Sequence, residues 1–381
     1  MATSNLVPET VLAAVATDAL TTELQTFSTP AIGPDDGLLQ VEASAVCGTD
    51  WEIYGRGSRG AGLGPLILGH ENVGRIAALG ERAAERWGVT VGDRVAVEEF
   101  LPCGTCRLCR DGNYRICEAT DSRSGKLFLR YGSTPTAIEP ALFGGFGEYL
   151  YLHPRAIVYH VGEELSPELA TLFVPVSNGI RWVVQEGGLQ LGQTVVIVGP
   201  GQHGLGCVVA AREAGAGKVI VVGTSADADR LEIAKTLGAN ETIIAEEINP
   251  VDAVMDITSG RGADMIVDLV PGAASTIEDA IAMVTKRGQI VLAASKHGAP
   301  VSGFAHDTVV RKEARLMGVR GHDHRSVEPA LDIIRSGRYP LELLCTHTYG
   351  LSQVDQALRM AGERSDSTAI HVSILPMFEE I

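Results

Sequence analysis

Four of the seven cysteines lie within fifteen residues, and their spacing is typical of a metal site. The pattern is C-x2-C-x2-C-x7-C, formed by Cys103, Cys106, Cys109 and Cys117. Such short spacings allow one loop to surround an ion and to present four thiolates at the corners of a tetrahedron. Because four protein ligands leave no open position, the pattern predicts a structural zinc site in a lobe of about residues 100–120.

An iron–sulfur cluster is the competing interpretation of these cysteines. The related cluster pattern is C-x2-C-x2-C-x3-C-P. In this chain the last gap is seven residues long, and no proline follows Cys117. The spacing therefore favours zinc.

A second group of metal-binding residue types lies earlier in the chain. Cys47 begins the segment Cys-Gly-Thr-Asp, and His70 and Glu71 lie in Gly-His-Glu-Asn-Val-Gly, followed by Gly80. One cysteine and one histidine are weak signals by themselves, since a free cysteine is often simply buried. Their interpretation depends on the motifs around them.

A glycine-rich segment follows a continuous apolar run at residues 194–198. Its pattern is G-x-G-x-x-G, and a helical stretch from Leu205 to Ala214 comes next. Between a buried strand and a helix, this pattern lets the backbone approach a pyrophosphate at the helix N-terminus. We therefore expect a dinucleotide site that includes Gly199, Gly201, Gln202, His203, Gly204 and Leu205.

The secondary-structure elements that must position these residues follow two different sequence patterns. Residues 1–176 alternate short β-like runs with Gly/Pro turns, which predicts a mostly β domain. Strands and helices then alternate, which predicts a doubly wound parallel sheet in a Rossmann cofactor domain at residues 177–320. Residues 321–381 are expected to return to the first domain. The predicted elements are strands at 194–198, 218–222, 241–244, 265–269 and 289–293, and helices at 205–214, 228–237, 273–284 and 327–334.

Taken together, these motifs resemble the zinc-dependent medium-chain dehydrogenases, a superfamily that includes alcohol, sorbitol and threonine dehydrogenases. The resemblance rests on the Cys-Gly-Thr-Asp segment, the Gly-His-Glu-x2-Gly-x5-Gly motif and the four-cysteine lobe. It implies an α/β protein with a GroES-like catalytic domain. It also implies an alcohol dehydrogenase that transfers hydride between a secondary alcohol or polyol and NAD(P)+, giving a ketone or aldehyde.

The same resemblance implies two zinc ions per subunit and assigns roles near the catalytic ion. Cys47 and His70 would bind that ion, Glu71 would be a direct or exchangeable ligand, and Asp50 would orient the imidazole of His70. Thr49 matches the family's proton-relay position. Glu52 stands where relatives often have histidine, and it either passes the proton onward or is an ordinary solvated charge.

One departure from the family affects the metal shell. Many relatives place a further ligand just before the cofactor domain, where this chain has Val174. A valine cannot bind metal, so Glu71 and water must complete the shell, as in polyol-type relatives. A weakened or absent catalytic metal is the alternative.

The choice between NAD and NADP stays open. An acidic residue usually ends the second strand and binds the ribose hydroxyls, but this chain has Gly223 there. Asp227 could take over that role. A 2′-phosphate could instead be bound by Thr224, Ser225 and Arg230.

Four further positions are expected near the cofactor by the family's layout. Val270, Ala293 and Ala294 follow predicted strands and could line the nicotinamide side. His371 stands where relatives often have a basic residue over the pyrophosphate, although a surface histidine is an equal alternative.

Charge and composition bear on the binding partners and the location of the protein. The net charge of −16 argues against partners such as nucleic acid or an anionic membrane surface. No apolar run reaches the roughly 18 residues of a membrane span, and no basic residue precedes Arg56, so we expect a cytoplasmic protein. Relatives are dimers or tetramers, which suggests a homodimer or homotetramer.

Two alternative functions come from other classes. A zinc-free quinone or enone reductase of the same superfamily would lack both the Cys/His pair and the four-cysteine lobe, which this chain has. A non-catalytic dinucleotide-binding protein would show no turnover with any alcohol.

Overall fold

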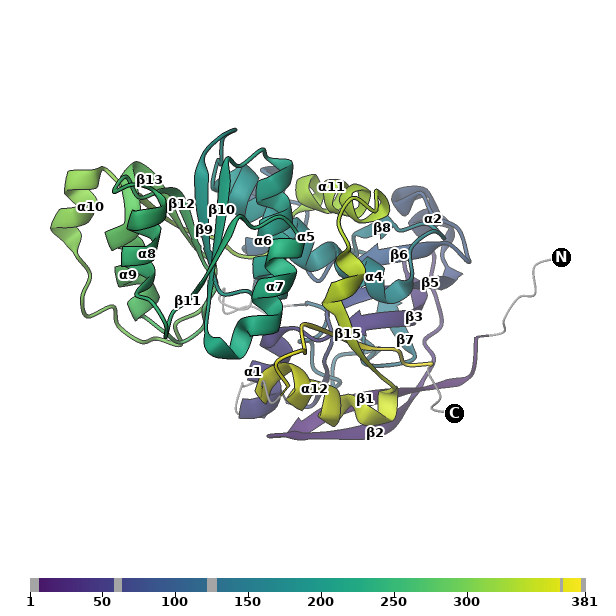
Figure 1. Cartoon of the computed structure of the whole chain (residues 1–381). Coiled ribbons are helices and arrows are strands. Elements are labelled where there is room, and N and C mark those ends of the chain that lie inside the picture. The colour runs from purple at the N-terminus through teal and green to yellow at the C-terminus, as the bar shows by residue number, and fades with distance from the viewer. Residues whose placement is uncertain (1–6, 58–63, 122–128, 364–365, 378–381) are drawn as a thin grey trace. The chain divides into compact units, whose positions relative to one another are not determined.

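The computed structural model describes residues 7–57, 64–121, 129–363 and 366–377. The chain divides into two compact units, one formed by Met1–Leu172 with Leu344–Ile381 and the other by Phe173–Leu343. Figure 1 shows the course of the chain through both. The first unit is called the β unit below, and the second the α/β unit.

The β unit is built on two sheets. The larger has the strand order β15-β16-β3-β5-β6-β8, with β7 paired to β3, and most of its pairs are antiparallel. Its strands are β3 (Gly37–Ala45), β5 (Glu71–Leu79), β6 (Arg94–Val97), β7 (Tyr149–Leu152), β8 (Val158–His160), β15 (Cys345–Tyr349) and β16 (His371–Ile374). The smaller sheet is antiparallel, in the order β2-β1-β4, with β1 (Thr10–Asp18), β2 (Thr21–Ser28) and β4 (Leu66–Ile67).

Short helices connect these strands. They are α1 (Gly48–Arg56), α2 (Glu81–Trp87), α3 (Arg107–Arg110), η1 (Tyr114–Ile116), α4 (Pro167–Thr171), η5 (Leu351–Gln353) and α12 (Val354–Glu363). Two apolar clusters form the core of the unit. One lies around Val15, Leu38 and Tyr54, and the other around Val41, Ile76 and Phe143.

The α/β unit has a six-stranded sheet whose pairs are all parallel. The order is β11-β10-β9-β12-β13-β14, from β9 (Thr194–Val198), β10 (Lys218–Gly223), β11 (Glu241–Ile244), β12 (Ala263–Asp268), β13 (Val284–Leu292) and β14 (Arg315–Gly318). The strand order reverses between β9 and β12. In a doubly wound sheet, ligands bind at the carboxyl ends of the strands at such a reversal.

Helices cover both faces of this sheet, as Figure 1 shows. One group contains α5 (Phe173–Gly179), the π-helical η2 (Ile180–Glu186), α6 (Gln202–Glu213), η3 (Ser225–Asp227) and α7 (Ala228–Thr236). The other contains α8 (Pro250–Ile257), α9 (Ser275–Met283) and α10 (His306–Lys312). The unit ends with α11 (His324–Arg335) and η4 (Leu341–Leu344). Covering both faces explains why the central strands are continuous apolar runs.

The boundary of the α/β unit lies further along the chain than the predicted boundary at residue 320. The helix α11 packs on α5 and therefore clusters with the α/β unit. Arg181 of η2 lies 3.5 Å from Asp323, and Trp182 Nε1 donates to the Gly321 carbonyl at 3.0 Å. These polar contacts hold the segment before α11 against η2. Sequence periodicity does not reveal them.

Element limits also differ from those expected. The helix α6 begins three residues before the predicted start at Leu205, with Gly201 as its N-cap. The strand β13 begins at Val284 rather than at residue 289. The helix α8 was not predicted, although Asn249 caps it and Pro250 occupies its first turn, which is a recognised helix-start signal.

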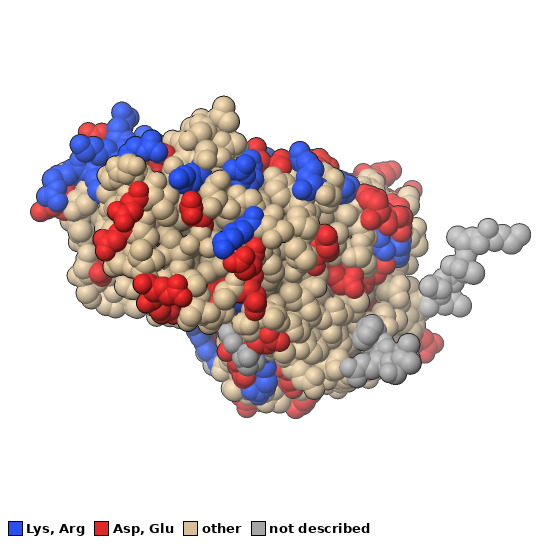
Figure 2. Space-filling view, in the orientation of Figure 1, with Lys and Arg blue, Asp and Glu red and all other residues tan. Residues whose placement is uncertain are grey.

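None of the helices in the described part of the chain has the length and apolar character needed to cross a bilayer. The negative net charge of −16 is unevenly spread over the surface. On the face drawn in Figure 2, Lys and Arg side chains gather around the end that carries α10, while Asp and Glu are scattered over the rest.

Candidate active site and metal centres

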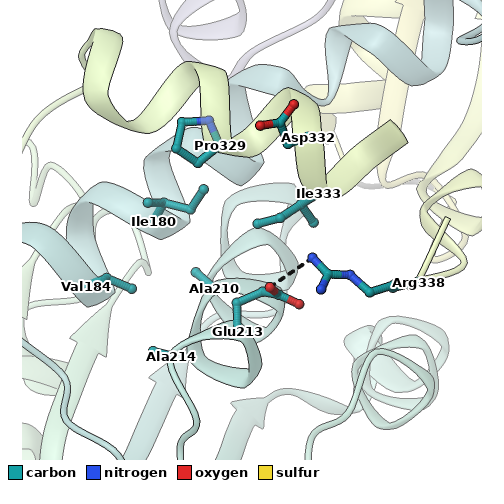
Figure 3. Close-up of a pocket in the computed structure, with 9 residues that line it drawn as sticks. All are labelled: Ile180, Val184, Ala210, Glu213, Ala214, Pro329, Asp332, Ile333 and Arg338. Atoms are coloured by element: carbon teal, nitrogen blue, oxygen red, sulfur yellow. Dashed lines mark hydrogen bonds and ion pairs between the residues drawn. The ribbon is translucent and has the colours of Figure 1, made fainter. Parts of the chain in front are cut away.

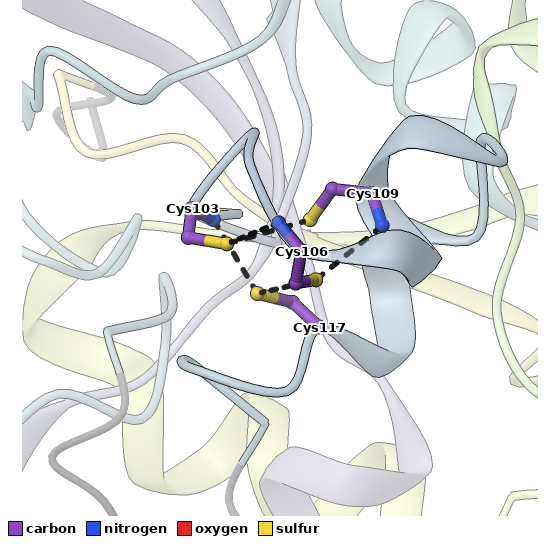
Figure 4. A group of neighbouring side chains, drawn as sticks. All are labelled: Cys103, Cys106, Cys109 and Cys117. Carbon is purple, nitrogen blue, oxygen red and sulfur yellow. Dashed lines mark hydrogen bonds between the residues drawn. The ribbon is translucent and has the colours of Figure 1, made fainter.

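The four lobe cysteines converge on one point, as Figure 4 shows. Their sulfur atoms all lie within 4.8 Å of one another, and the Cys103–Cys109 and Cys106–Cys117 sulfurs are each 3.9 Å apart. A tetrahedral zinc with Zn–S bonds of about 2.3 Å requires sulfur–sulfur distances of about 3.8 Å. The lobe therefore has the dimensions of a four-thiolate zinc site.

Local hydrogen bonds also favour a thiolate at this point. The Cys103 sulfur accepts from the Thr105 hydroxyl at 3.5 Å, from the Thr105 N–H at 3.4 Å and from the Cys106 N–H at 3.3 Å. These donors, the hydroxyl first, lower the pKa of the Cys103 thiol to about 5. A deprotonated sulfur is the form that binds metal.

Strand pairing in the β unit brings the second group together. Ala45, the last residue of β3, pairs with Glu71, the first residue of β5. Cys47 lies two residues after the end of β3, and α1 begins at Gly48. The Cys47 sulfur and a Glu71 carboxylate oxygen consequently lie within 4.8 Å of each other.

Asp50 fixes the geometry of this group from the first turn of α1. Its carboxylate accepts from the Cys47 N–H at 2.9 Å and from the Gly69 N–H at 3.2 Å. It also lies 3.2 Å from His70 Nδ1, the contact that the resemblance predicts. Because Nδ1 is occupied by Asp50, Nε2 is the nitrogen that His70 can offer to a metal.

Burial disfavours the charged forms of the two acidic groups at this site. Glu71 is fully buried, and neither carboxylate oxygen has a hydrogen-bond partner among the described residues. Burial raises the pKa of the Glu71 carboxyl to about 8 and also raises the pKa of the Cys47 thiol. Burial opposes protonation of His70, but the carboxylates of Asp50 and Glu99 outweigh it and raise the pKa of the imidazole well above its usual value. The sulfur, nitrogen and oxygen donors fit a zinc ion, which would supply the missing positive charge.

The two residues considered for proton transfer both lie on α1. Thr49 is half-buried in the first turn. Glu52 lies one turn later, with 40% of its side chain exposed and one carboxylate oxygen 3.9 Å from Arg56. This geometry allows either interpretation of Glu52, since an exposed carboxylate can carry a proton or remain solvated.

His371 is not a surface histidine. It lies in β16 with no exposed surface, and its Nε2 is 2.7 Å from the Thr171 hydroxyl. This buried contact rules out the surface alternative. A role over the pyrophosphate remains a prediction.

Several predicted cofactor residues of the α/β unit follow the carboxyl ends of its parallel strands. Gly199 follows β9 with φ of 102°, a backbone conformation that favours glycine. A side chain at Gly204 would meet the Gly199 carbonyl oxygen at 2.0 Å. Val270 follows β12, and a side chain at Gly199 would lie 3.2 Å from its methyl group. Ala293 and Ala294 follow β13, and the Ala293 N–H donates to the Asp268 carbonyl at 3.0 Å.

The remaining loop residues are arranged by nearby side chains. The His203 ring packs edge-on against Trp182 at 5.5 Å, and its Nδ1 lies 3.4 Å from the Asn178 amide. Gln202 is half-exposed and Leu205 is buried, so only the former of these two offers a polar group at the helix start.

The loop after β10 uses Asp227 differently from the expectation that it binds ribose. Its carboxylate accepts from the Thr224 N–H at 3.0 Å and hydroxyl at 2.7 Å, and it pairs with buried Arg230 at 2.9 Å. Ser225 donates to Glu246 instead, at 3.0 Å from its N–H and 3.5 Å from its hydroxyl. Arg230 is therefore neutralised inside the loop, and a carboxylate covers Ser225.

Three residues at these sites escaped the sequence reasoning. They are Glu99 beside His70, Lys296, and Glu246 beside Ser225. The Lys296 ammonium lies 2.8 Å from Asp268 and donates to the Val270 carbonyl at 2.5 Å. Glu99 has no signal in the sequence, because its place beside His70 depends on the pairing of β5 with β6, where Val97 opposes Asn72.

A separate cleft on the α/β unit contains none of the predicted site residues (Figure 3). Its volume is about 350 Å³, and residues of η2, α6 and α11 line it together with Arg338. Arg338 pairs with Glu213 at 3.0 Å across its floor. The cleft lies on helix surfaces, away from the strand ends where a dinucleotide would bind.

Comparisons with known proteins identify the family. Residues 33–162 match the alcohol dehydrogenase GroES-like domain, and residues 204–336 match the zinc-binding dehydrogenase domain. The chain is 43% identical to a probable alcohol dehydrogenase of Mycobacterium tuberculosis, over 92% of this chain and 94% of that protein. It is 31% identical to the sorbitol dehydrogenase of Bacillus subtilis, over 94% and 95% respectively. The crystal structure of an alcohol dehydrogenase from Thermotoga maritima superposes with a TM-score of 0.83 at 25% identity, covering 96% and 99% of the two chains.

The chain belongs to the zinc-dependent medium-chain dehydrogenase superfamily. It is an oxidoreductase of the alcohol dehydrogenase class, which acts on CH–OH groups and uses zinc and a nicotinamide cofactor. The predicted fold class, a GroES-like domain with a Rossmann domain, is confirmed. None of these comparisons favours the reductase or the non-catalytic alternative.

Proposed function

We propose that this protein oxidises a secondary alcohol or a polyol to a carbonyl compound with NAD+ as hydride acceptor. Relatives named sorbitol dehydrogenase and erythritol/L-threitol dehydrogenase match 95% and 99% of their own lengths to this chain, and they support the polyol class. The family layout also supports a homodimer or homotetramer, which sedimentation of the purified protein would test.

One observation carries the catalytic part of the proposal, namely the buried carboxylate of Glu71. It lies beside the Cys47 sulfur, and its oxygens have no hydrogen-bond partner among the described residues. Cys47, His70 and Glu71 would hold a zinc ion, which acts as a Lewis acid toward the substrate oxygen. Asp50 would keep Nε2 of His70 available, and Thr49 with Glu52 would carry the hydroxyl proton toward solvent.

The second zinc ion would be structural. The sulfur–sulfur distances of 3.9 Å support a closed four-thiolate site made of Cys103, Cys106, Cys109 and Cys117. Such a site contributes folding energy and leaves no position for substrate.

The charges after β10 support NAD over NADP. Gly223 offers no side chain, and Arg230, the candidate phosphate-binding cation of this loop, is buried and paired with Asp227. The Ser225 N–H and hydroxyl, which could receive a 2′-phosphate, already donate to Glu246. A phosphate would have to displace this exposed carboxylate, whereas ribose hydroxyls could donate to it.

Initial rates with a panel of secondary alcohols and polyols, with NAD+ and NADP+ and with or without chelator, would test the function. We expect turnover that requires metal and prefers NAD+. His306→Ala is a matched control for His70→Ala, since His306 is exposed. Chelator-resistant turnover, or none with any alcohol, would contradict the proposal.

Binding constants for NADH and NADPH would test the cofactor preference apart from catalysis. Fluorescence titration should give tighter binding of NADH to the natural protein, and Glu246→Lys should shift affinity toward NADPH. Glu247→Lys is the control, since it alters charge at the neighbouring exposed position. Equal affinities that Glu246→Lys leaves unchanged would exclude Glu246 as the determinant.

A further inference from the structure

The catalytic group described above offers Cys47, His70 and Glu71, the last as a direct or exchangeable ligand. The position where many relatives carry an additional ligand is occupied by Val174, which has no donor atom. Zinc in catalytic sites usually has three protein ligands and one open position. A further donor within the β unit would free Glu71 from permanent ligation.

Glu99 lies where such a donor is needed. The strand β6 ends at Val97, which pairs with Asn72, so the chain leaves β6 beside His70 and Glu71. Glu99 Oε2 is 3.6 Å from His70 Nε2. Two ligands of a tetrahedral zinc with bonds of about 2.0–2.1 Å are separated by about 3.4 Å. The observed distance is therefore close to that between two ligands of one ion.

Surrounding contacts hold Glu99 in this orientation. Its Oε1 pairs with Arg130, whose guanidinium lies over the Phe100 ring at 5.1 Å. Its N–H donates to Glu98 at 3.0 Å, and its carbonyl accepts from the Tyr131 N–H at 2.9 Å. Glu99 is only 8% exposed. One carboxylate oxygen is thus anchored, and the other points toward the metal-binding nitrogen of His70.

Charge supports the same conclusion. Two buried carboxylates lie at this site, Glu71 beside Cys47 and Glu99 beside His70, and Arg130 pairs with Glu99. Burying uncompensated charge is costly unless a counter-ion is present. A divalent cation among Cys47, His70, Glu71 and Glu99 would supply the balance.

We propose that Glu99 is a protein ligand of the catalytic zinc, occupying the role that Val174 cannot fill. The proposal rests on the proposed function, because it assumes zinc at Cys47 and His70. Arg130 fixes Glu99, whereas no hydrogen bond from the described residues holds the Glu71 carboxylate.

Metal affinity and the spectrum of a substituted ion test this assignment without relying on turnover. Zinc affinity is measured by competition with a chelator in the full-length protein and in Glu99→Gln, Glu99→Asp and Glu98→Gln. Glu98 is the matched control, because it is the adjacent buried carboxylate, it accepts from Tyr114, and a glutamine there keeps a side-chain oxygen to accept from the Glu99 N–H. Cobalt placed at the catalytic site reports ligand identity through its visible absorption.

We expect Glu99→Gln to weaken binding at the catalytic site by about 100-fold or more, above the usual cost of losing an outer-shell group. The cobalt absorption should change in Glu99→Gln, and Glu99→Asp should fall between this variant and the natural protein. Glu98→Gln should retain both properties. Occupancy of the four-cysteine lobe and circular dichroism establish that each variant is folded.

Unchanged zinc affinity and an unchanged cobalt spectrum in Glu99→Gln would overturn the assignment. A change in the KM for alcohol alone, with both of these properties unchanged, would overturn it as well. A failure of the proposed function looks different. In that case the natural protein holds no metal at Cys47, and Cys47→Ser has the same metal content as the natural protein.

Discussion

The two groups of metal-binding residues differ in how the chain assembles them. The four cysteines of the lobe lie within fifteen residues, and local turns bring their sulfurs to within 4.8 Å of one another. The second group joins residues after β3, before and within β5, and after β6, so it exists only once the sheet has formed. The lobe is suited to stabilising the fold, whereas the second group is suited to catalysing a reaction.

The donor atoms of the two groups also differ. Four equivalent thiolates close a tetrahedron, whereas a thiol, an imidazole and carboxylates provide unequal donors that can exchange. Glu71 has no described hydrogen-bond partner, and Asp50 holds His70 from behind. A carboxylate without a fixed hydrogen-bond partner beside an oriented imidazole fits a site that also admits substrate.

The largest expected effect is the loss of activity in His70→Ala. Removing Nε2 should eliminate the Lewis acid and lower kcat/KM by about 10³-fold or more, which corresponds to several kcal/mol. Steady-state kinetics with the best alcohol from the panel measures this effect. If His70→Ala retained normal kcat/KM, the two metal groups would not differ as described here.

Cys109→Ser should affect stability instead. Losing one thiolate opens the lobe, and the melting temperature should fall by roughly 10 °C as the metal's contribution to folding is lost. Differential scanning calorimetry measures the shift, with Cys345→Ser as a control because Cys345 lies outside both groups. A fall in activity at low temperature without a fall in melting temperature would reverse the roles of the two groups.

A smaller effect is expected from Asp50→Asn. The carboxylate that orients His70 would become a neutral amide, and zinc affinity at the catalytic site should fall by about 10–100-fold. Chelator competition gives the affinity, and the lobe serves as an internal reference. Equal weakening at both sites would indicate a general folding defect.

The smallest expected effect is a loss of folding stability in acid. It comes from proton binding at His153 and not from release of metal. Burial, with Arg155 beside it, lowers the pKa of His153 to about 4, whereas Asp36 opposes this shift. The Arg155 N–H donates to Nδ1 at 3.0 Å, which requires a neutral ring. Tyr151 packs against the ring and donates its hydroxyl to Asp36 at 2.8 Å.

The unfolded state binds a proton at His153 below pH of about 6.5, and the folded state only below about 4. The folded state is therefore fully stable above this window and loses stability as the pH falls through it, by about 2 kcal/mol for this partly exposed ring. Urea unfolding of the natural protein and of His153→Gln between these pH values measures the difference. Parallel pH profiles for both would exclude His153 as the source.

Prediction from the sequence succeeded where the chemistry is local. The lobe, the glycine loop and the parallel sheet follow from spacing and apolar runs, and the strands β10 and β11 lie where the sequence predicts them. Asp50 could be placed because it lies three residues after Cys47 in a recognised segment.

Contacts between distant residues could not be predicted in this way. Glu99 reaches His70 because β5 pairs with β6, and Glu246 reaches Ser225 because β11 lies beside β10. Spacing along the chain carries no information about either contact. The burial of His371 likewise depends on β16 lying between β15 and β3.

Metal analysis of three proteins decides whether the chain holds two zinc ions with different roles. Zinc per chain is measured in the natural protein, in Cys47→Ser and in Cys109→Ser after dialysis against a weak chelator. We expect two zinc ions per chain in the natural protein and one in each variant, with alcohol oxidation lost only in Cys47→Ser. Equal zinc content in Cys47→Ser and the natural protein would contradict this expectation, as would iron with labile sulfide in the lobe.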